Sequence, residues 1–205
     1  RLIEGDELDL TAAVDGASDA ERTPAEGETR ALVYWLNVAG LVPAYDLGRG
    51  LHFMSVFAAH ALRSRQPAFA GIAYGMLAAM FSASRFTKAR AIRIGEHAVA
   101  LARSHGAAAV SSSTLAFVAY AHWLRGEPRA AHALAAEAAR VLEASPESHP
   151  YAAWVARTLQ AYTLLSMGQL AQAVPLFDES ERIARQSGDD LGYLGGASAL
   201  RFLAS

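Results

Sequence analysis

The fold is decided by two copies of one pattern, AYAHWLRGEPRAA at residues 119–131 and AYTLLSMGQLAQA at residues 161–173. Aligning the glycines Gly126 and Gly168 sets a period of 42 residues, and it also aligns Ala119 with Ala161, Tyr120 with Tyr162 and Ala131 with Ala173. Around each glycine, the stretch from Ser112 to Gly188 repeats a helix, a tight turn and a second helix. Such a period indicates stacked helical repeats, because one helix pair cannot bury its apolar face alone.

The same spacing extends to both sides of these two copies. Apolar periodicity and turn residues predict helices over residues 47–65, 68–84, 87–104, 109–125, 128–144, 151–167, 170–186 and 191–203, after a helix that ends at Pro43. The segment ARSHG, which ends at Gly106, matches ARQSG, which ends at Gly188 two periods later. We therefore expect an all-α repeat domain over residues 28–205, with about four and a half helix pairs. The unpaired last helix would leave an apolar face open for more of the protein or for a second copy in a homo-oligomer.

The first residues differ in charge from the rest of the chain. Residues 1–28 hold nine acidic and two basic side chains, with few apolar residues after Leu10. This composition predicts an acidic linker or a poorly ordered lead-in over residues 1–27. Because the sequence has no initiating Met, and RLIEGDELDL lacks the features of a signal peptide, we expect a cytoplasmic piece of a longer protein.

Composition excludes several classes of function. The chain has no cysteine, which excludes disulfides, thiolate catalysis and Cys-type zinc sites. Its formal net charge is −2, without the basic excess that marks a nucleic-acid-binding domain. Residues 66–84 and 106–124 carry no charge, but they are rich in Ala, Gly and Ser, which favours buried helices over membrane spans. We therefore expect neither a nucleic-acid partner nor a membrane partner.

Motifs for catalytic or cofactor chemistry are missing from the sequence. Lys88 lies in SRFTKARA, without the glycines of a phosphate-binding loop, and the GRG at residues 48–50 lacks the third glycine of a dinucleotide site. Two pairs of histidines share a helix face but lie eight residues apart, too far for one metal ion: His52 with His60 and His97 with His105. A helical enzyme therefore has no support from residue spacing, and we expect no catalytic residue, no metal and no cofactor.

Charged side chains on the predicted helices favour solvated surfaces. Opposite charges lie four residues apart, as surface ion pairs do, at Asp178 with Arg182 and Glu181 with Arg185. One basic set could meet an acidic peptide or nucleic acid, but it favours a solvent-facing helix surface because it lacks wider clustering: Arg85, Lys88, Arg90 and Arg93.

Several features of the two copies resemble the tetratricopeptide (TPR) pattern. These are the small residue in the first helix, the turn glycine, Ala131 or Ala173 in the second helix, and Phe177 four residues later. The period exceeds the usual 34 residues, the early aromatic residue of the pattern is missing, and the proline that normally ends a unit is absent after the final complete one. The resemblance implies antiparallel TPR-like helix pairs that stack into a right-handed superhelical solenoid.

In TPR-like stacks the first helix of each pair lines the concave groove. The repeat then places one set of apolar and aromatic residues on an inward-facing strip: Met76, Met80, Tyr120, Trp123, Tyr162 and Leu165. Methionine adapts its shape and aromatic rings are rigid, a combination that suits a peptide-binding groove. The same residue types would equally fill the core between repeats, so both interpretations stay open.

A second resemblance covers residues 28–83. The helix around Trp35, Asp46 before the turn at Gly48, the helix LHFMSVFAAHAL and the small-residue helix after Pro67 resemble a segment of bacterial fusion proteins. In those proteins a serine/threonine kinase is joined to a STAND-type (AAA-like) ATPase, and the similar segment follows the ATPase module. The resemblance implies a non-catalytic arm of a cytoplasmic signalling regulator, whose partners include its own upstream kinase and ATPase domains.

These observations predict a protein-interaction or sensor scaffold that binds a peptide or protein segment in its concave groove. The alternative is a small-molecule sensor, in which the aromatic and methionine side chains of the groove enclose an apolar effector.

Overall fold

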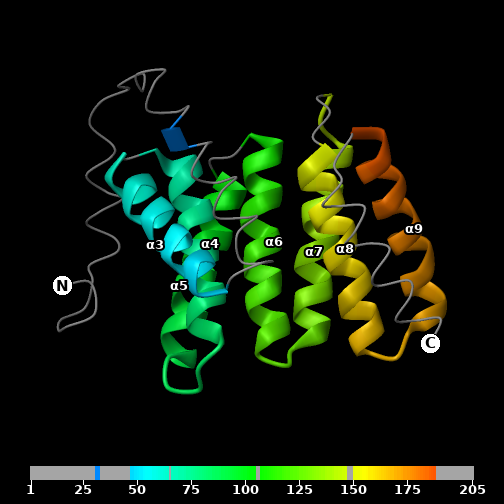
Figure 1. Cartoon of the computed structure of the whole chain (residues 1–205), viewed down its shortest axis with the longest axis horizontal. Coiled ribbons are helices and arrows are strands. Elements are labelled where there is room, and N and C mark those ends of the chain that lie inside the picture. Colours follow the sequence, from blue (N-terminus) through cyan, green and yellow to red (C-terminus); the bar gives the residue numbers. More distant parts are fainter. Residues whose placement is uncertain (1–30, 33–46, 65, 105–106, 147–149, 188–205) are drawn as a thin grey trace.

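The computed structural model describes residues 31–32, 47–64, 66–104, 107–146 and 150–187. In the part from residue 47 onward these ranges form seven helices and no strand (Figure 1): α3 (Leu47–Arg63), α4 (Pro67–Ser82), α5 (Lys88–Ser104), α6 (Ala108–Leu124), α7 (Pro128–Glu143), α8 (Pro150–Ser166) and α9 (Leu170–Ser187). The expected all-α class is therefore confirmed, and the ends of the seven helices differ from the predicted ones by at most two residues.

Three predictions lie outside the described residues. They are the acidic lead-in over residues 1–27, most of the helix before Pro43 and the last helix over residues 191–203. Of the helix before Pro43, the structure describes Ala31 and Leu32, which are helical.

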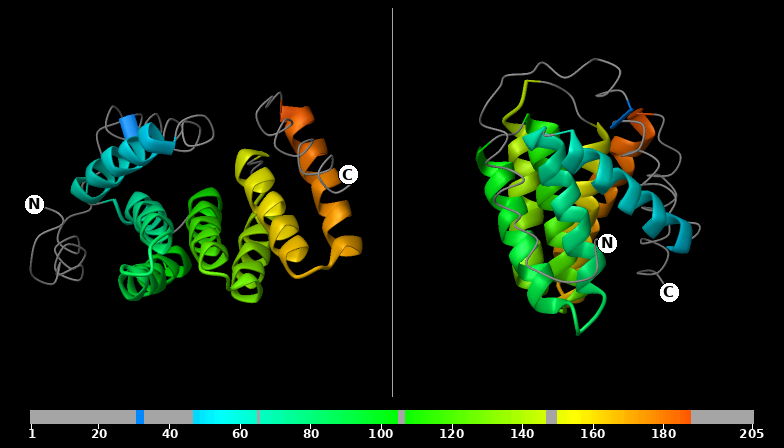
Figure 2. Two further views of the ribbon diagram at one scale, coloured as in Figure 1. Left: turned by 60° about the horizontal axis from the view of Figure 1, so that its bottom comes forward. Right: turned by 90° about the vertical axis from the view of Figure 1, so that its left-hand side faces the viewer.

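Each odd-numbered helix from α5 onward packs against the helix before it, and the even-numbered helices pack against one another. α4 contacts α5 and α6, α6 contacts α7 and α8, and α8 contacts α9. The turns α4–α5, α6–α7 and α8–α9 all lie at one edge of the molecule, the lower edge in Figure 1. Figure 2 shows the helices following one another across the molecule in chain order, from α3 to α9.

The position of the uncharged helices explains their composition. α4 lies against α3, α5 and α6, and eleven of its residues are buried. A helix enclosed on so many sides has no solvent-facing stripe for charged residues, because an unpaired buried charge is costly. No helix in the described ranges is long and apolar enough to cross a membrane.

The two copies of the sequence pattern adopt the same turn. Gly126 and Gly168 have φ of 74° and 75°, a left-handed conformation that glycine adopts without strain. The N–H of Gly126 donates to the carbonyl oxygen of Trp123 at 2.9 Å, and that of Glu127 donates to His122 at 3.0 Å. Gly168 and Gln169 donate to Leu165 and Leu164 in the same way, both at 2.9 Å. Both helices thus end in a Schellman motif, 42 residues apart.

The alanines that the alignment pairs are all fully buried. Ala119 and Ala161 on the first helices, and Ala131 and Ala173 on the second helices, each have 0% of their surface exposed. Only a small side chain lets two helix backbones approach closely at a crossing, so these positions mark equivalent crossings in α6–α7 and α8–α9.

One of the two predicted ion pairs on α9 is confirmed and one is wrong. Arg185 pairs with Glu181, as expected. Arg182 pairs with Glu179, three residues earlier, and not with Asp178. Its Nε and Nη2 donate to the two carboxylate oxygens of Glu179 at 2.7 and 2.6 Å. This two-point geometry is stronger than a single contact, which explains the choice of partner.

Candidate functional site

Four aromatic rings form a continuous row across α6, α8 and α9, which we call the aromatic row: Tyr120, Trp123, Tyr162 and Phe177. Tyr120 stacks on Trp123 with 5.7 Å between ring centroids and 23° between planes. Trp123 lies 6.3 Å from Tyr162, which meets Phe177 edge to face at 5.2 Å. Aromatic pairs in such geometries contribute about 0.5–1.5 kcal/mol each beyond the area they bury.

The aromatic row runs from the surface to the core. Tyr120 has 42% of its surface exposed, whereas Phe177 has none. Between them, Trp123 and Tyr162 are half-buried, and burial raises the pKa of the Tyr162 hydroxyl. One end of the row is therefore available to a ligand while the other end is held rigidly, an arrangement typical of binding anchors.

A hydrogen bond links the indole of Trp123 on α6 to α8, the first helix of the following pair. Its Nε1–H donates to the Ser166 hydroxyl oxygen at 2.8 Å. The Ser166 hydroxyl in turn donates to the carbonyl oxygen of Tyr162 at 2.8 Å. Because both polar groups are satisfied within the protein, the ring can present its apolar surface without a polar group left unpaired.

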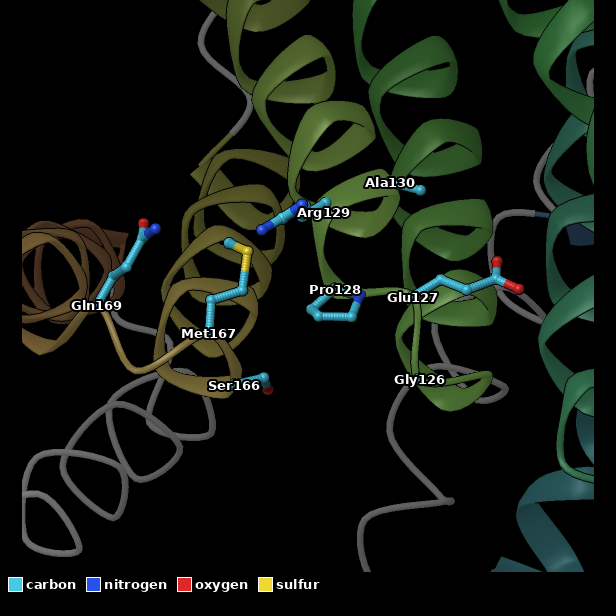
Figure 3. Close-up of a pocket in the computed structure, with 8 residues that line it drawn as sticks. All are labelled: Gly126, Glu127, Pro128, Arg129, Ala130, Ser166, Met167 and Gln169. Atoms are coloured by element: carbon cyan, nitrogen blue, oxygen red, sulfur yellow. The ribbon is translucent and has the colours of Figure 1, made fainter.

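Next to Ser166 lies an open hollow of about 570 Å³ between the turns α6–α7 and α8–α9 (Figure 3). Its lining comes from the two Schellman turns and the residues that follow them: Gly126, Glu127, Pro128, Arg129, Ala130, Ser166, Met167 and Gln169. In Figure 3 the side chains of Arg129 and Met167 point toward each other, whereas the Glu127 carboxylate points away. Arg129 is exposed, so the hollow presents a cation beside a thioether.

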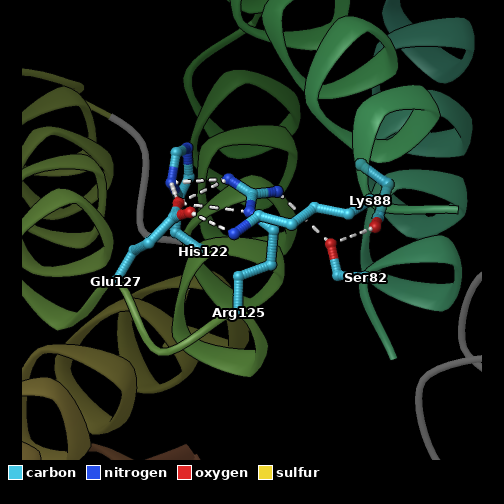
Figure 4. Close-up of polar contacts among 6 residues, drawn as sticks. Ser82, Lys88, His122, Arg125 and Glu127 are labelled. Carbon is cyan, nitrogen blue, oxygen red and sulfur yellow. Dashed lines mark hydrogen bonds and ion pairs between the residues drawn. The ribbon is translucent and has the colours of Figure 1, made fainter. Parts of the chain in front are cut away.

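The Glu127 carboxylate points away because it belongs to a polar network on the other side of the turn (Figure 4). Arg125, whose side chain is only 3% exposed, donates to Oε2 of Glu127 from Nε at 3.1 Å and from Nη2 at 2.9 Å. Arg125 Nη1 also donates to the Ser82 hydroxyl at 3.3 Å. Lys88 Nζ lies 3.5 Å from Oε1 of Glu127. The network thereby joins the turn α6–α7 to the end of α4 and the start of α5.

The charges in this network are compensated. Hydrogen bonds from Arg125 lower the pKa of Glu127 to about 2, against the opposing effect of burial. Burial lowers the pKa of His122, although its contact with Glu127 raises it. Nδ1 of His122 lies 2.7 Å from Nη2 of Arg125 and 2.8 Å from Oε2 of Glu127. It can accept from the guanidinium when it carries no proton and donate to the carboxylate when it carries one. A satisfied network of this kind is structural, since buried polar groups are costly unless paired.

The structure brings together four of the six predicted groove residues. Tyr120, Trp123 and Tyr162 belong to the aromatic row, and Leu165 packs against the cluster that contains Phe177. Met76 and Met80 lie apart from them, in the core against α3: Met76 is fully buried there and Met80 is partly buried. α3 covers the part of α4 that carries these two methionines, so they do not extend the exposed strip.

The hollow is the part of the site that sequence reasoning missed. Its residues follow the two aligned turn glycines, and stacked repeats place equivalent turns next to each other. Residues 127–130 and 169 could therefore have been predicted as neighbours from the 42-residue alignment alone. The orientation of the Glu127 carboxylate could not be predicted in this way, because it depends on the buried Arg125.

The described residues contain no candidate metal site. Within those ranges no three His, Asp or Glu side chains gather as a metal site would require.

Comparisons with protein-family models, with curated protein sequences and with solved structures found no match. The resemblances to TPR repeats and to kinase–ATPase fusion proteins therefore stay predictions.

Proposed function

We propose that this chain is a non-catalytic binding scaffold, and that it binds a peptide or protein segment across α6 and α8. The exposed end of the aromatic row would hold an apolar side chain of the ligand. Arg129 in the adjoining hollow would hold an acidic or carbonyl group of the same ligand. The repeated Schellman turns and the buried alanines support TPR-like helix pairs, and we propose that these continue as a right-handed superhelical solenoid.

The observation that carries this proposal is that a half-exposed aromatic stack is hydrogen-bonded, through Trp123, to Ser166 in the lining of an open hollow. Tyrosine and tryptophan are enriched among the residues that dominate binding energy, because they supply rigid apolar area together with a polar group. The stack of Tyr120 on Trp123 is held by the hydrogen bond to Ser166, so a ligand would not have to order it.

A small-molecule effector remains the second candidate. The volume of about 570 Å³ lies within the range of about 300–1,000 Å³ that is usual for ligand pockets. Such pockets are lined mainly by apolar side chains and enclose most of the ligand. In this hollow the apolar residues Pro128, Ala130 and Met167 are mixed with charged and polar ones, and the hollow is open to solvent. This favours an extended peptide over an enclosed apolar effector.

The wider setting of the scaffold rests on the second sequence resemblance. We propose that it acts as the sensor arm of a larger cytoplasmic signalling regulator, next to kinase and ATPase domains. A ligand would bias such a regulator only by binding its two states with different affinity. Equal affinity for the isolated arm and for the full-length resting protein would contradict this role.

The binding surface can be tested without knowing the natural partner. Random peptides displayed on phage are selected on the immobilised chain, and the affinity of selected peptides is measured by calorimetry. Tyr120→Ala should weaken their binding about tenfold or more, as expected for a binding hot spot. Tyr151→Ala is the matched control, because Tyr151 on α8 is 44% exposed and lies 5.8 Å from the ring of Trp154.

Unchanged affinity in Tyr120→Ala would overturn the proposed site. Equal weakening in Tyr120→Ala and Tyr151→Ala would overturn it as well. A thermal-shift screen of small ligands tests the second candidate function, the small-molecule sensor. Stabilisation by a small ligand that Tyr120→Ala abolishes, with no peptide selected, would favour the small-molecule sensor.

A further inference from the structure

Charge is strongly segregated along this chain. Residues 1–28 hold nine acidic and two basic side chains, whereas residues 29–95 hold eight basic and a single acidic side chain, Asp46. From residue 96 onward the chain is nearly balanced, with ten acidic and eight basic side chains. Two neighbouring segments thus carry opposite formal charges of equal size, and the described part of the second segment contains α3, α4 and the start of α5.

The start of α5 presents a basic and apolar surface. Phe86, in the turn before α5, is 84% exposed, which is the largest value among the exposed apolar side chains of the described residues. The Arg85 guanidinium lies 4.8 Å from the centre of the Phe86 ring. Further along the outer face of α5, Ile92 is 36% exposed and Arg93 is exposed. We call these four residues the α5 entry surface.

Few acidic groups lie close to this surface. The Glu127 carboxylate forms ion pairs with Lys88, whose Nζ lies 3.5 Å from Oε1, and with Arg125. Glu96 is the next acidic residue on α5 itself, one turn beyond Ile92 and Arg93. No ion pair of Arg85 or Arg93 occurs within the described residues. The cations of the surface are therefore available to an acidic partner.

The beginning of the chain has the matching chemistry. Residues 2–10, LIEGDELDL, combine four apolar with four acidic side chains. An apolar and acidic segment complements a surface that combines exposed phenylalanine and isoleucine with arginine. Because the segment belongs to the same chain, its binding to the surface would be intramolecular, which raises its effective concentration there.

We propose that residues 2–10 bind to the α5 entry surface of the same chain, with acidic side chains on Arg85 and Arg93 and leucine or isoleucine on Phe86. This interaction does not depend on the proposed function, since it uses the turn α4–α5 and not the aromatic row. A nucleic acid is a weaker occupant, because the chain as a whole has a formal net charge of −2.

Because the chain has no cysteine, an introduced cysteine is the single site for a thiol-reactive label. A nitroxide attached through Thr11→Cys labels the full chain at one site beside the acidic segment. In an amide NMR spectrum at low salt, the signals of Phe86 and Ile92 should lose most of their intensity, while that of Gln186 on α9 should keep it. Intensity should return in 1 M NaCl, where the Debye length falls to about 3 Å.

Charge variants show whether these groups carry the interaction. Arg85→Glu with Arg93→Glu should restore the signals at low salt, and adding Asp6→Lys with Asp9→Lys should quench them again. Arg140→Glu with Arg185→Glu, which makes the same charge change elsewhere, should leave the quenching as it was. Circular dichroism of each variant verifies that it is folded.

Three results would overturn the proposal. The first is no quenching at Phe86 and Ile92 at low salt. The second is quenching that survives Arg85→Glu with Arg93→Glu. The third is quenching of an unlabelled, isotope-enriched chain by a spin-labelled chain in a mixture, which would place the segment on a second copy.

Discussion

The junction of α4 with α6 and that of α6 with α8 join equivalent helices of successive pairs, but they are filled in different ways. Between α4 and α6 the backbones approach so closely that a Cβ atom at Gly75 would lie 3.0 Å from Cβ of Phe117 and 3.1 Å from the carbonyl oxygen of Thr114. Between α6 and α8 the packing is less extensive, and the rings of Trp123 and Tyr162 meet there.

The turns beside these junctions differ in the same sense. Beside the first, Arg125 and Glu127 tie the turn α6–α7 to Ser82 and Lys88. Beside the second, the turns α6–α7 and α8–α9 leave a hollow with Arg129 at its wall. The two junctions therefore differ although their helices are equivalent. Glycine allows close packing at the first, and a partly exposed ion pair holds the turn beside it. Large aromatic residues fill the second.

The largest effect is expected at the buried end of the aromatic row. Phe177→Ala removes a fully buried ring and should lower the free energy of unfolding by about 3–5 kcal/mol. Urea unfolding followed by circular dichroism measures this change. A loss below about 1 kcal/mol would mean that the row is not anchored in the core.

A matched pair of glycine substitutions tests the closed junction. Gly75→Ala should destabilise the protein by about 1–3 kcal/mol, because the added carbon would press on backbone and on Phe117. A Cβ atom at Gly95 would lie 3.4 Å from Cγ1 of Val118 and 3.7 Å from Cβ of Ala78. Gly95→Ala should therefore be neutral or stabilise the protein by up to about 1 kcal/mol. Equal effects of the two substitutions would contradict the closure of the α4–α6 junction by glycine.

The network beside the closed junction should show in the pH dependence of stability. The pKa of Glu127 is lower in the folded state, about 2 against an ordinary value of 4.5. Its contribution is therefore complete above pH 4.5 and is lost as the pH falls toward 2. After a discount for partial exposure of the carboxylate, Glu127→Gln should cost about 1 kcal/mol at pH 7 and almost nothing at pH 2.

Urea unfolding at several pH values between 2 and 7 measures this difference, with Asp178→Asn as the control for an exposed acidic residue. A constant difference between wild type and Glu127→Gln across this pH range would show that Arg125 does not hold the carboxylate in its charged form.

At the exposed end of the aromatic row we expect a much smaller effect on stability than at its buried end. Tyr120 is 42% exposed, so Tyr120→Ala should change the free energy of unfolding by about 0.5 kcal/mol or less from lost burial, plus its share of the ring stack. Thermal unfolding measures this. A loss as large as that of Phe177→Ala would assign Tyr120 to the core and remove it from the binding site.

The repeat and its helices were predictable from sequence because they rest on local chemistry. Glycine at 126 and 168 specifies a left-handed turn residue, and Pro128 specifies the first turn of a helix. The buried alanines followed from the alignment of the two copies. These signals need no knowledge of which helices meet in space.

The filling of each junction was less predictable because it depends on three-dimensional neighbours. Met76 and Trp123 are both large apolar residues on first helices, yet α3 covers Met76 whereas Trp123 reaches Ser166. The sequence predicts an ordinary surface arginine at position 125. In the structure Arg125 is buried, and its ion pair with Glu127 holds that carboxylate away from the hollow. Charge segregation was visible in sequence, whereas the exposure of Phe86 was not.

The most direct test of the difference between the two junctions is to map a selected peptide on the full chain by amide NMR. We predict that the largest shift changes fall on Tyr120, Trp123 and Arg129, at the α6–α8 junction and its hollow. The amides of Gly75 and Thr114, at the closed junction, should keep their positions. Shift changes centred on Gly75 and Thr114, with those of Tyr120 and Arg129 unchanged, would contradict the assignment of binding to the open junction.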